Sequence, residues 1–365
     1  MAQQTKVGMV KQKIKEWINE GKVLPGEKIY SENELVKMFE VSRHTVRQAV
    51  GDLVHEGYLY REQGAGTFVA NRRTEAKRMP PTGKNIGVIT TYITDYIFPS
   101  IIKGIESHLS QQGYSLTFAC TDNNPEKERQ CLETMINRNV DGLIVEPTRS
   151  SSYNPNLHYY LQMEQNNTPF LMINQYYPQL NPPHIILDDE KGGFIATDHL
   201  IGLGHRKVIG LFKSDDIQGL NRMQGFIRAF REKNIAFFPE MIITYTTEQE
   251  EEDFLNKLKG VLLSGERPTG IVCYNDEIAI SVLNLLRELG LKVPDHISIV
   301  GYDDSYLAEA SETKITSVTH PKMEMGVEAA KWVVSAVENR DKAGTYQKVY
   351  QPELVIRSST KAISK

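Results

Sequence analysis

The sequence predicts two modules of different fold class. An α+β winged helix-turn-helix comes first, followed by a larger α/β body with two lobes of doubly wound parallel sheet. The first 70 residues read as three helices and a hairpin, whereas from residue 86 onward short apolar strands alternate with amphipathic helices. Formal charge also changes sign: residues 1–80 hold 14 Lys and Arg against 10 Asp and Glu, and the remainder holds 28 against 36. A basic head on an acidic body is typical of a nucleic-acid reader joined to another module.

Length and composition exclude several classes of protein. A chain of 365 residues corresponds to two or three domains at roughly 150 residues each. Its cysteines (Cys120, Cys131 and Cys273) are odd in number, widely spaced and without a CxxC pair, which indicates neither disulfides nor zinc. No apolar run approaches the roughly 18 residues of a membrane span, and the first residues lack a signal-peptide pattern. We therefore expect a soluble, cytoplasmic protein with no membrane partner.

The N-terminal module is predicted from helix caps and apolar spacing. Residues 6–19 place Val10, Ile14 and Trp17 on one helical face. Ser31 with Glu34 three positions later makes a capping box for a second helix. A short break then leads to Ser42, which caps a third helix, and two short strands follow around a glycine turn, at 58–61 and 67–69. This is the plan of a helix-turn-helix with a wing.

The outer face of the third helix carries side chains suited to phosphates and base edges, among them Arg43, His44 and Arg47. The motifs IYSENEL (29–35), VSRHTVRQA (41–49) and QGAGTFV (63–69) resemble the winged-helix head of GntR-type bacterial regulators. The resemblance implies base or phosphate contacts by the arginines and a DNA-binding wing. The predicted DNA-binding residues are Lys6, Ser31, Glu32, Ser42, Arg43, His44, Thr45, Arg47, Gln63, Gly64, Gly66 and Thr67.

A basic, proline-containing segment without apolar period separates the modules. We therefore expect a DNA-binding domain at 1–70, a linker at 71–84 and an effector and dimerisation body at 85–365. Within the body, strands are predicted at 86–90, 115–119, 141–145, 170–173, 185–187, 207–212, 270–274 and 297–302. The first crossing between lobes is expected near 175–183, where three prolines break the alternation.

Enzyme motifs are missing from this body. No GxGxxG follows a strand, and neither a phosphate-binding P-loop, a GxSxG elbow nor an HExxH pair occurs. The nine histidines are scattered without metal-ligand spacing. The sequence therefore predicts no catalytic residues, no metal site and no cofactor.

Polar residues instead collect where strands end: Glu146, Asn174, Asn275 and Asp303 each follow an apolar run, and Arg222 is expected to begin a helix after another strand. In open α/β sheets, ligands bind outside the carboxyl ends of the strands. Amides, carboxylates and an arginine suit hydroxyls that both donate and accept, which favours a sugar-like polyol. Each residue alone could equally be a helix cap.

The body also resembles the effector domain of LacI/GalR-type repressors, which is similar to periplasmic sugar-binding proteins. The motifs that carry the resemblance are DGLIV (141–145), HLIGLGHRK (199–207), RMQGF (222–226), YND (274–276) and ISIVGYDD (297–304). It implies that Asn174, Arg222, Asn275 and Asp303 line an effector cleft with His320 near it, although Asn174 stands where the family usually has aspartate. Tyr92 and Glu146 complete the predicted effector-binding residues.

A GntR-type head on a LacI-type body resembles the arabinose-responsive repressors of bacilli. The resemblance implies a homodimer that binds a palindromic operator and releases it when L-arabinose binds. A repressor for another pentose, a hexose or a nucleoside remains an alternative. A sugar-modifying enzyme with a DNA-binding head is a more distant one, for which Glu146, Asp276 and Asp303 are the candidate bases. The basic head and the missing signal peptide argue against a periplasmic carrier.

Overall fold

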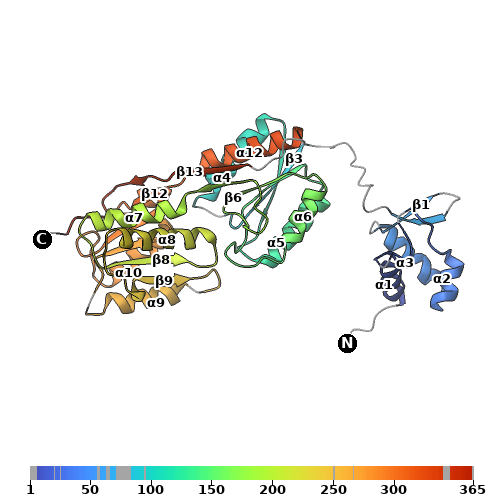
Figure 1. Ribbon diagram of the computed structural model, residues 1–365, viewed down its shortest axis with the longest axis horizontal. Coiled ribbons are helices and arrows are strands. Elements are labelled where there is room, and N and C mark those ends of the chain that lie inside the picture. Colours follow the sequence, from blue (N-terminus) through green and yellow to red (C-terminus); the bar gives the residue numbers. More distant parts are fainter. Residues whose placement is uncertain are drawn as a thin grey trace. The chain divides into compact units, whose positions relative to one another are not determined.

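The computed structural model describes residues 6–19, 21–24, 26–55, 58–62, 66–70, 84–93, 96–249, 251–265, 267–339 and 346–363. The chain divides into two compact units, residues 1–82 and 83–365 (Figure 1). Residues 71–83 of the predicted linker and the predicted wing-tip residues Gln63 and Gly64 lie outside the described residues. None of the described helices has the length and apolar character needed to cross a membrane.

The N-terminal unit is a winged helix-turn-helix, as the sequence predicted. Its elements are α1 (Lys6–Asn19), α2 (Glu32–Phe39), α3 (Arg43–His55), β1 (Leu59–Glu62) and β2 (Gly66–Val69). The strands pair antiparallel, with Leu59 opposite Val69. Apolar faces of the three helices and both strands meet in one core. Burial of these periodic side chains explains why so small a unit folds around three short helices.

The turn between α2 and α3 is specified by caps. Ser31 Oγ accepts from Glu34 N at 3.3 Å, and the Glu34 carboxylate accepts from Ser31 N at 2.7 Å, so the predicted capping box is present. Glu40 ends α2 in the left-handed region at φ 51°. Ser42 Oγ then accepts from Thr45 N at 3.1 Å and caps α3.

The C-terminal unit contains two six-stranded sheets, which confirms the predicted two-lobed α/β body. Lobe 1 has the strand order β13-β7-β6-β5-β3-β4, all parallel, and lobe 2 has β14-β12-β11-β10-β8-β9, parallel except for the β12–β14 pair. The lobe 1 strands are β3 (Asn85–Thr90), β4 (Ser115–Cys120), β5 (Gly142–Val145), β6 (Phe170–Asn174), β7 (His184–Leu187) and β13 (Gln347–Tyr350). The lobe 2 strands are β8 (Val208–Lys213), β9 (Ile242–Tyr245), β10 (Gly270–Cys273), β11 (Ser298–Asp303), β12 (Thr316–Thr319) and β14 (Leu354–Val355).

Helices cover both faces of each sheet, which explains why the central strands are apolar on both sides. In lobe 1, α4 and α12 pack on one face and α5 and α6 on the other; in lobe 2, α7 and α8 oppose α9 and α10 (Figure 1). The bounds are α4 (Phe98–Gln111), α5 (Pro125–Asn137), α6 (Leu157–Gln165), α7 (Asp189–Gly202), α8 (Ile217–Glu232), α9 (Glu251–Leu262), α10 (Asp276–Glu288), α11 (Tyr306–Ala310) and α12 (Lys322–Glu338), with a 3-10 turn at Pro239–Met241.

The first crossing between the lobes is not where the sequence predicted it. Residues 175–183 join β6 to β7, and β7 still pairs with β6, with His184 opposite Met172. The chain passes to lobe 2 only at residue 188, before α7, and it passes between the lobes again after β12 and after β13. The prolines interrupt a loop within lobe 1 and do not end its sheet.

Close packing of α7 against α8 fixes the helix that carries Arg222. A Cβ at Gly193 of α7 would lie 2.0 Å from the backbone oxygen of Arg222, and one at Gly225 of α8 would lie 1.9 Å from that of Glu190. The two helix backbones therefore approach to a distance that only glycine permits. Arg222 is held on a rigid element, in the second turn of α8 rather than at its start as the sequence predicted.

Candidate functional site

A cavity of about 270 Å³ lies between the two lobes of the C-terminal unit. Loops that follow β3, β4, β5 and β6 form one wall, and the ends of β8, β9, β10 and β11 with the segments that follow them form the other. Its size is below the roughly 300–1,000 Å³ of sites for drug-sized ligands, so a small molecule fits it best. The position outside the carboxyl ends of parallel strands is the one that the strand-end pattern predicted.

Glu146 is the centre of a buried network on the lobe 1 wall. Its carboxylate accepts from Thr91 N at 2.9 Å, from the Thr91 hydroxyl, and from Asn174 Nδ2 at 2.7 Å. Burial raises the pKa of Glu146, while the bonds from Thr91 and Asn174 act in the opposite direction. Asn174 Oδ1 contacts His320 Nε2 at 3.0 Å, and burial lowers the pKa of His320 to about 4.

This network separates the seven predicted effector residues into two layers. Asn174 and His320 are buried behind Glu146, outside the described residues that line the cavity. Because Asn174 Nδ2 points at a carboxylate, its Oδ1 requires a donor, and His320 supplies it as the Nε2–H tautomer. The cavity wall itself carries the other five predicted residues, Tyr92, Glu146, Arg222, Asn275 and Asp303.

Arg222 reaches the cavity from α8, and its guanidinium has four partners in the protein. Nε donates to Asp189 Oδ1 at 2.8 Å and Nη1 to the Tyr274 carbonyl at 2.7 Å, while Nη2 lies 3.5 Å from Asp303 Oδ1. The ring of Tyr302 lies 3.6 Å from the guanidinium carbon. Burial raises the pKa of Asp189 to about 6 even though Arg222 lowers it. The Nη2 contact is the longest, which leaves that N–H the best able to reach a ligand oxygen.

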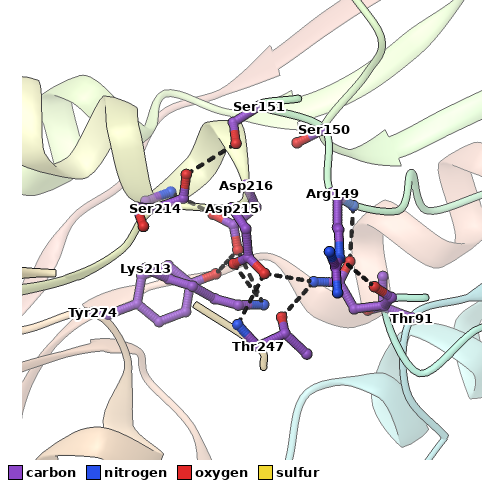
Figure 2. Close-up of polar contacts among 12 residues, drawn as sticks. Thr91, Arg149, Ser150, Ser151, Lys213, Ser214, Asp215, Asp216, Thr247 and Tyr274 are labelled. Carbon is purple, nitrogen blue, oxygen red and sulfur yellow. Dashed lines mark hydrogen bonds and ion pairs between the residues drawn. The ribbon is translucent and has the colours of Figure 1, made fainter. Parts of the chain in front are cut away.

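A second charged group lies on the lobe 2 wall where β8 ends. Lys213 Nζ lies 3.7 Å from Asp215 and 3.5 Å from Asp216, and the Tyr274 hydroxyl donates to Asp216 at 2.8 Å (Figure 2). Lys213, Asp216 and Tyr274 all line the cavity. The sequence reasoning did not select them, although Lys213 and Tyr274 stand at strand ends and the same rule could have found them.

Tyr96 joins the two lobes across the cavity. Its hydroxyl contacts the Asp303 carboxylate, lies 3.0 Å from the Tyr302 carbonyl, and accepts from Asp276 N at 3.2 Å. Burial raises the pKa of Tyr96 well above its usual value, so the hydroxyl keeps its proton at neutral pH. A lobe 1 phenol is thus hydrogen-bonded to the same aspartate that pairs with Arg222.

Asp276, one of the candidate bases of the enzyme alternative, has a structural role, because both oxygens of its carboxylate accept hydrogen bonds within the protein. It is fully buried at the start of α10, and its carboxylate accepts from Ser305 N and Ser317 Oγ, both at 2.7 Å. Burial raises its pKa to about 7. It does not line the cavity, and among the described residues no group of three or more His, Cys, Asp or Glu could hold a metal ion. The other two candidate bases, Glu146 and Asp303, do line the cavity, where Thr91 and Tyr96 respectively donate hydrogen bonds to their carboxylates.

In the N-terminal unit three of the predicted DNA-binding side chains lie on the exposed face of α3. Arg43, His44 and Arg47 are exposed, whereas Val46 on the opposite face is buried. Glu32 of α2 holds both arginines, at 3.3 Å from Arg43 Nε and 3.0 Å from Arg47 Nη2. The hydroxyls of Ser31, Ser42 and Thr45 take part in the helix caps, and Gly66 and Thr67 begin β2. Lys6 is exposed in the first turn of α1.

Comparisons with known proteins agree with both units. Residues 6–69 match the bacterial regulatory proteins of the gntR family, and residues 197–360 match the periplasmic binding protein-like domain. The arabinose metabolism transcriptional repressor of Halalkalibacterium halodurans is 52% identical over 98% of this chain and 97% of that protein. The repressor of the same name from Geobacillus stearothermophilus is 47% identical over 97% of each chain.

Solved structures resemble the body. The transcription regulator CcpA of Lactococcus lactis matches with a TM-score of 0.68 at 25% identity, covering 76% of this chain and all of that one. A LacI family regulator from Enterococcus faecium, solved with bound ribose, matches with a TM-score of 0.66 at 25% identity, covering 77% of this chain and all of that one.

The chain is a sugar-responsive transcriptional repressor. This class is defined by its DNA-binding winged helix-turn-helix, by the polar cavity between the lobes, and by these relatives. The prediction of a regulator rather than an enzyme is confirmed by the relatives. Within that class, the chain belongs to the family of the two arabinose metabolism repressors, with which it shares about half of its residues over nearly its whole length.

Proposed function

We propose that this protein is a homodimeric repressor that binds a palindromic operator and releases it when L-arabinose closes the interlobe cavity. Operator contacts are assigned to residues 1–70 and effector binding to residues 85–365, joined by 71–84. The observation that carries the proposal is the cavity, in which five predicted residues from both lobes converge around a space of about 270 Å³. The names of the two relatives at 47–52% identity support arabinose as the sugar.

The polar wall fits a pentose chemically. Lys213 and Arg222 are donors, Glu146 and Asp303 are acceptors, and the amide of Asn275 is both. Each hydroxyl of a sugar both donates and accepts, so alternating partners of this kind leave few groups unsatisfied. The aromatic ring of Tyr92 adds a flat apolar surface for the C–H face of the sugar.

A panel of ligands tests the effector. Thermal unfolding is measured with L-arabinose, D-xylose, D-ribose, D-galactose and adenosine at equal concentration. L-Arabinose should raise the melting temperature most, because at equal concentration the ligand with the lowest Kd for the folded state stabilises it most. A larger shift with D-ribose would favour the second candidate, a repressor for another pentose, which the ribose-bound relative suggests. No shift with any sugar would contradict the proposal.

Two measurements test the DNA part. Sedimentation should give a dimer, since a two-fold protein binds two half-sites of a palindrome. In a gel shift, L-arabinose should release the operator fragment, and tighter binding in its presence would show that the proposed direction of coupling is wrong.

A further inference from the structure

The lobes are joined by contacts away from the cavity as well as inside it. The loop that follows β5, residues 147–156, extends from lobe 1 to lobe 2, and we call it the latch loop. Arg149, Ser150 and Ser151 of this loop lie outside the described residues that line the cavity. Figure 2 shows Ser151 in contact with Ser214, which directly follows β8.

Two serines of the latch loop bind backbone groups of lobe 2. Ser151 Oγ donates to the Ser214 carbonyl at 2.9 Å. Ser150 Oγ accepts from Ile217 N at 2.9 Å while it donates to Gln175 Oε1 at 2.5 Å. Ile217 is the first residue of α8, whose first N–H groups have no partner within the helix. Asp216 of lobe 2 is the N-cap of this helix, and a hydroxyl of lobe 1 binds the first N–H group of the same helix, which carries Arg222.

Beside the latch loop, two polar residues that themselves line the cavity, Asn123 and Thr247, also join the lobes. Asn123 Nδ2 donates to Thr247 Oγ1 at 2.6 Å and lies 3.5 Å from Asp215 Oδ2. Its Oδ1 accepts from Arg149 N at 2.9 Å, which ties it to the latch loop. Arg149 Nη2 lies 2.5 Å from Glu248, but Glu248 is largely exposed, so this pair contributes little.

The latch loop is held in place within lobe 1 by a buried carboxylate. Glu128 of α5 is fully buried and accepts from Asn154 at 2.5 Å, from Asn156 at 2.9 Å and from Tyr177 at 2.8 Å. The Tyr177 hydroxyl in turn accepts from Thr148 N at 2.8 Å. Bonds at both ends of the loop fix its shape, so little conformational entropy is lost when it meets lobe 2.

We propose that the latch loop sets the equilibrium between open and closed lobes, and so tunes effector affinity and operator release without touching the effector. This inference rests on the proposed function, in which closure accompanies sugar binding. These contacts exist only while the lobes are closed, and they stabilise that state with or without sugar, so their loss should raise the dissociation rate of the sugar and leave its association rate unchanged.

Serine-to-alanine variants of the full chain test the latch. Ser151→Ala removes one hydrogen bond between the lobes and no bond to a residue of the cavity wall. Ser150→Ala removes one bond between the lobes, leaves Ile217 N–H without its partner, and also removes the bond to Gln175 of the cavity wall. Each should weaken L-arabinose binding by about three- to tenfold through faster dissociation, with Ser150→Ala the stronger. Ser152→Ala is the matched control, because Ser152 is the next residue, is exposed, and contacts lobe 2 in no bond found among the described residues. Its affinity should equal that of the wild type.

A measurement without sugar separates this inference from the proposed effector. Amide hydrogen exchange of the peptide containing Ile217 should be faster in Ser150→Ala than in the wild type or Ser152→Ala. Faster exchange in a protein that binds no sugar would support the latch and contradict the effector proposal. Unchanged exchange, or changed exchange with unaltered affinity for a sugar that does bind, would overturn the latch.

Discussion

Replacing Arg222 by lysine probes the cavity most sharply. Alanine would leave Asp189 and Asp303 buried without a cation, at a cost of about 3–5 kcal/mol in folding stability that would obscure any effect on binding. Lysine keeps the charge and can still reach Asp189. It cannot also donate to the Tyr274 carbonyl, stack on Tyr302 and reach a ligand, because its ammonium is a single point rather than a planar fork.

The expected loss follows from one charge-assisted hydrogen bond. Arg222 Nη2 has only the 3.5 Å contact with Asp303, so we expect it to donate to a sugar hydroxyl. Such a bond contributes about 1.5–3 kcal/mol, and Arg222→Lys should therefore raise the Kd for the effector by about 10- to 150-fold. Isothermal titration gives the Kd, and a gel shift without sugar should show unchanged operator binding.

The matched control is Arg228→Lys. Arg228 lies on the same helix but is partly exposed and pairs with Glu190 at 2.6 Å, away from the cavity wall. Its exchange for lysine should change the Kd by less than twofold. A Kd for Arg222→Lys within twofold of the wild type would refute the assignment of Arg222 to the effector.

Three further predictions concern the head, the packing of α7 and the pH dependence of stability. Arg47→Ala should weaken operator binding about fivefold or more, as expected for one lost base or phosphate contact, and leave the sugar-induced melting shift unchanged; equal operator affinity in a gel shift would contradict it. Gly193→Ala should lower the free energy of unfolding by at least about 1–3 kcal/mol, because its Cβ would lie 2.0 Å from the Arg222 carbonyl. Gly202→Ala on the same helix meets open space and should be neutral in the same thermal melts, so equal behaviour of the two variants would refute the packing argument. Burial lowers the pKa of His320 from 6.5 to about 4, so the unfolded chain binds the extra proton first as pH falls. The neutral His320 ring contributes fully to the free energy of unfolding above pH 6.5, and up to about 3 kcal/mol of that contribution is lost as the pH falls to 4. In urea unfolding, the difference in free energy of unfolding between the wild type and His320→Gln should therefore become smaller from pH 7 to pH 5. A difference in free energy of unfolding that grows as the pH falls would contradict the lowered pKa of His320.

The sequence was most informative where a local pattern has one structural outcome. Ser31 with Glu34 could be predicted as a capping box because both partners lie within one helical turn. Glu146, Asn275 and Asp303 could be predicted at one cavity because parallel strands align their carboxyl ends.

It was least informative where partners come from distant segments. Asn174 also follows a strand, yet a strand end does not specify depth, and the Glu146 carboxylate covers it. Asp189 pairs with Arg222 because α7 and α8 approach each other closely at their glycines. No local sequence pattern predicts such an approach. The strands at 242–245, 316–319, 347–350 and 354–355 were missed. None is longer than four residues, and all except 316–319 lie at an edge of a sheet.

The loop at 175–183 shows that proline residues alone do not mark a boundary between lobes. Prolines there were interpreted as a boundary between lobes, but proline ends hydrogen bonding only locally, and β7 resumes the same sheet after it. Pairing of distant strands, rather than the breaks between them, defines a lobe.

Reciprocal coupling between the two units tests the central claim most directly. The Kd of the full chain for L-arabinose is measured with and without saturating operator DNA, and the Kd for operator is measured with and without saturating L-arabinose. The account predicts that both constants rise by the same factor, because the two ligands favour different states of one protein. A sugar affinity that is identical with and without operator would contradict it.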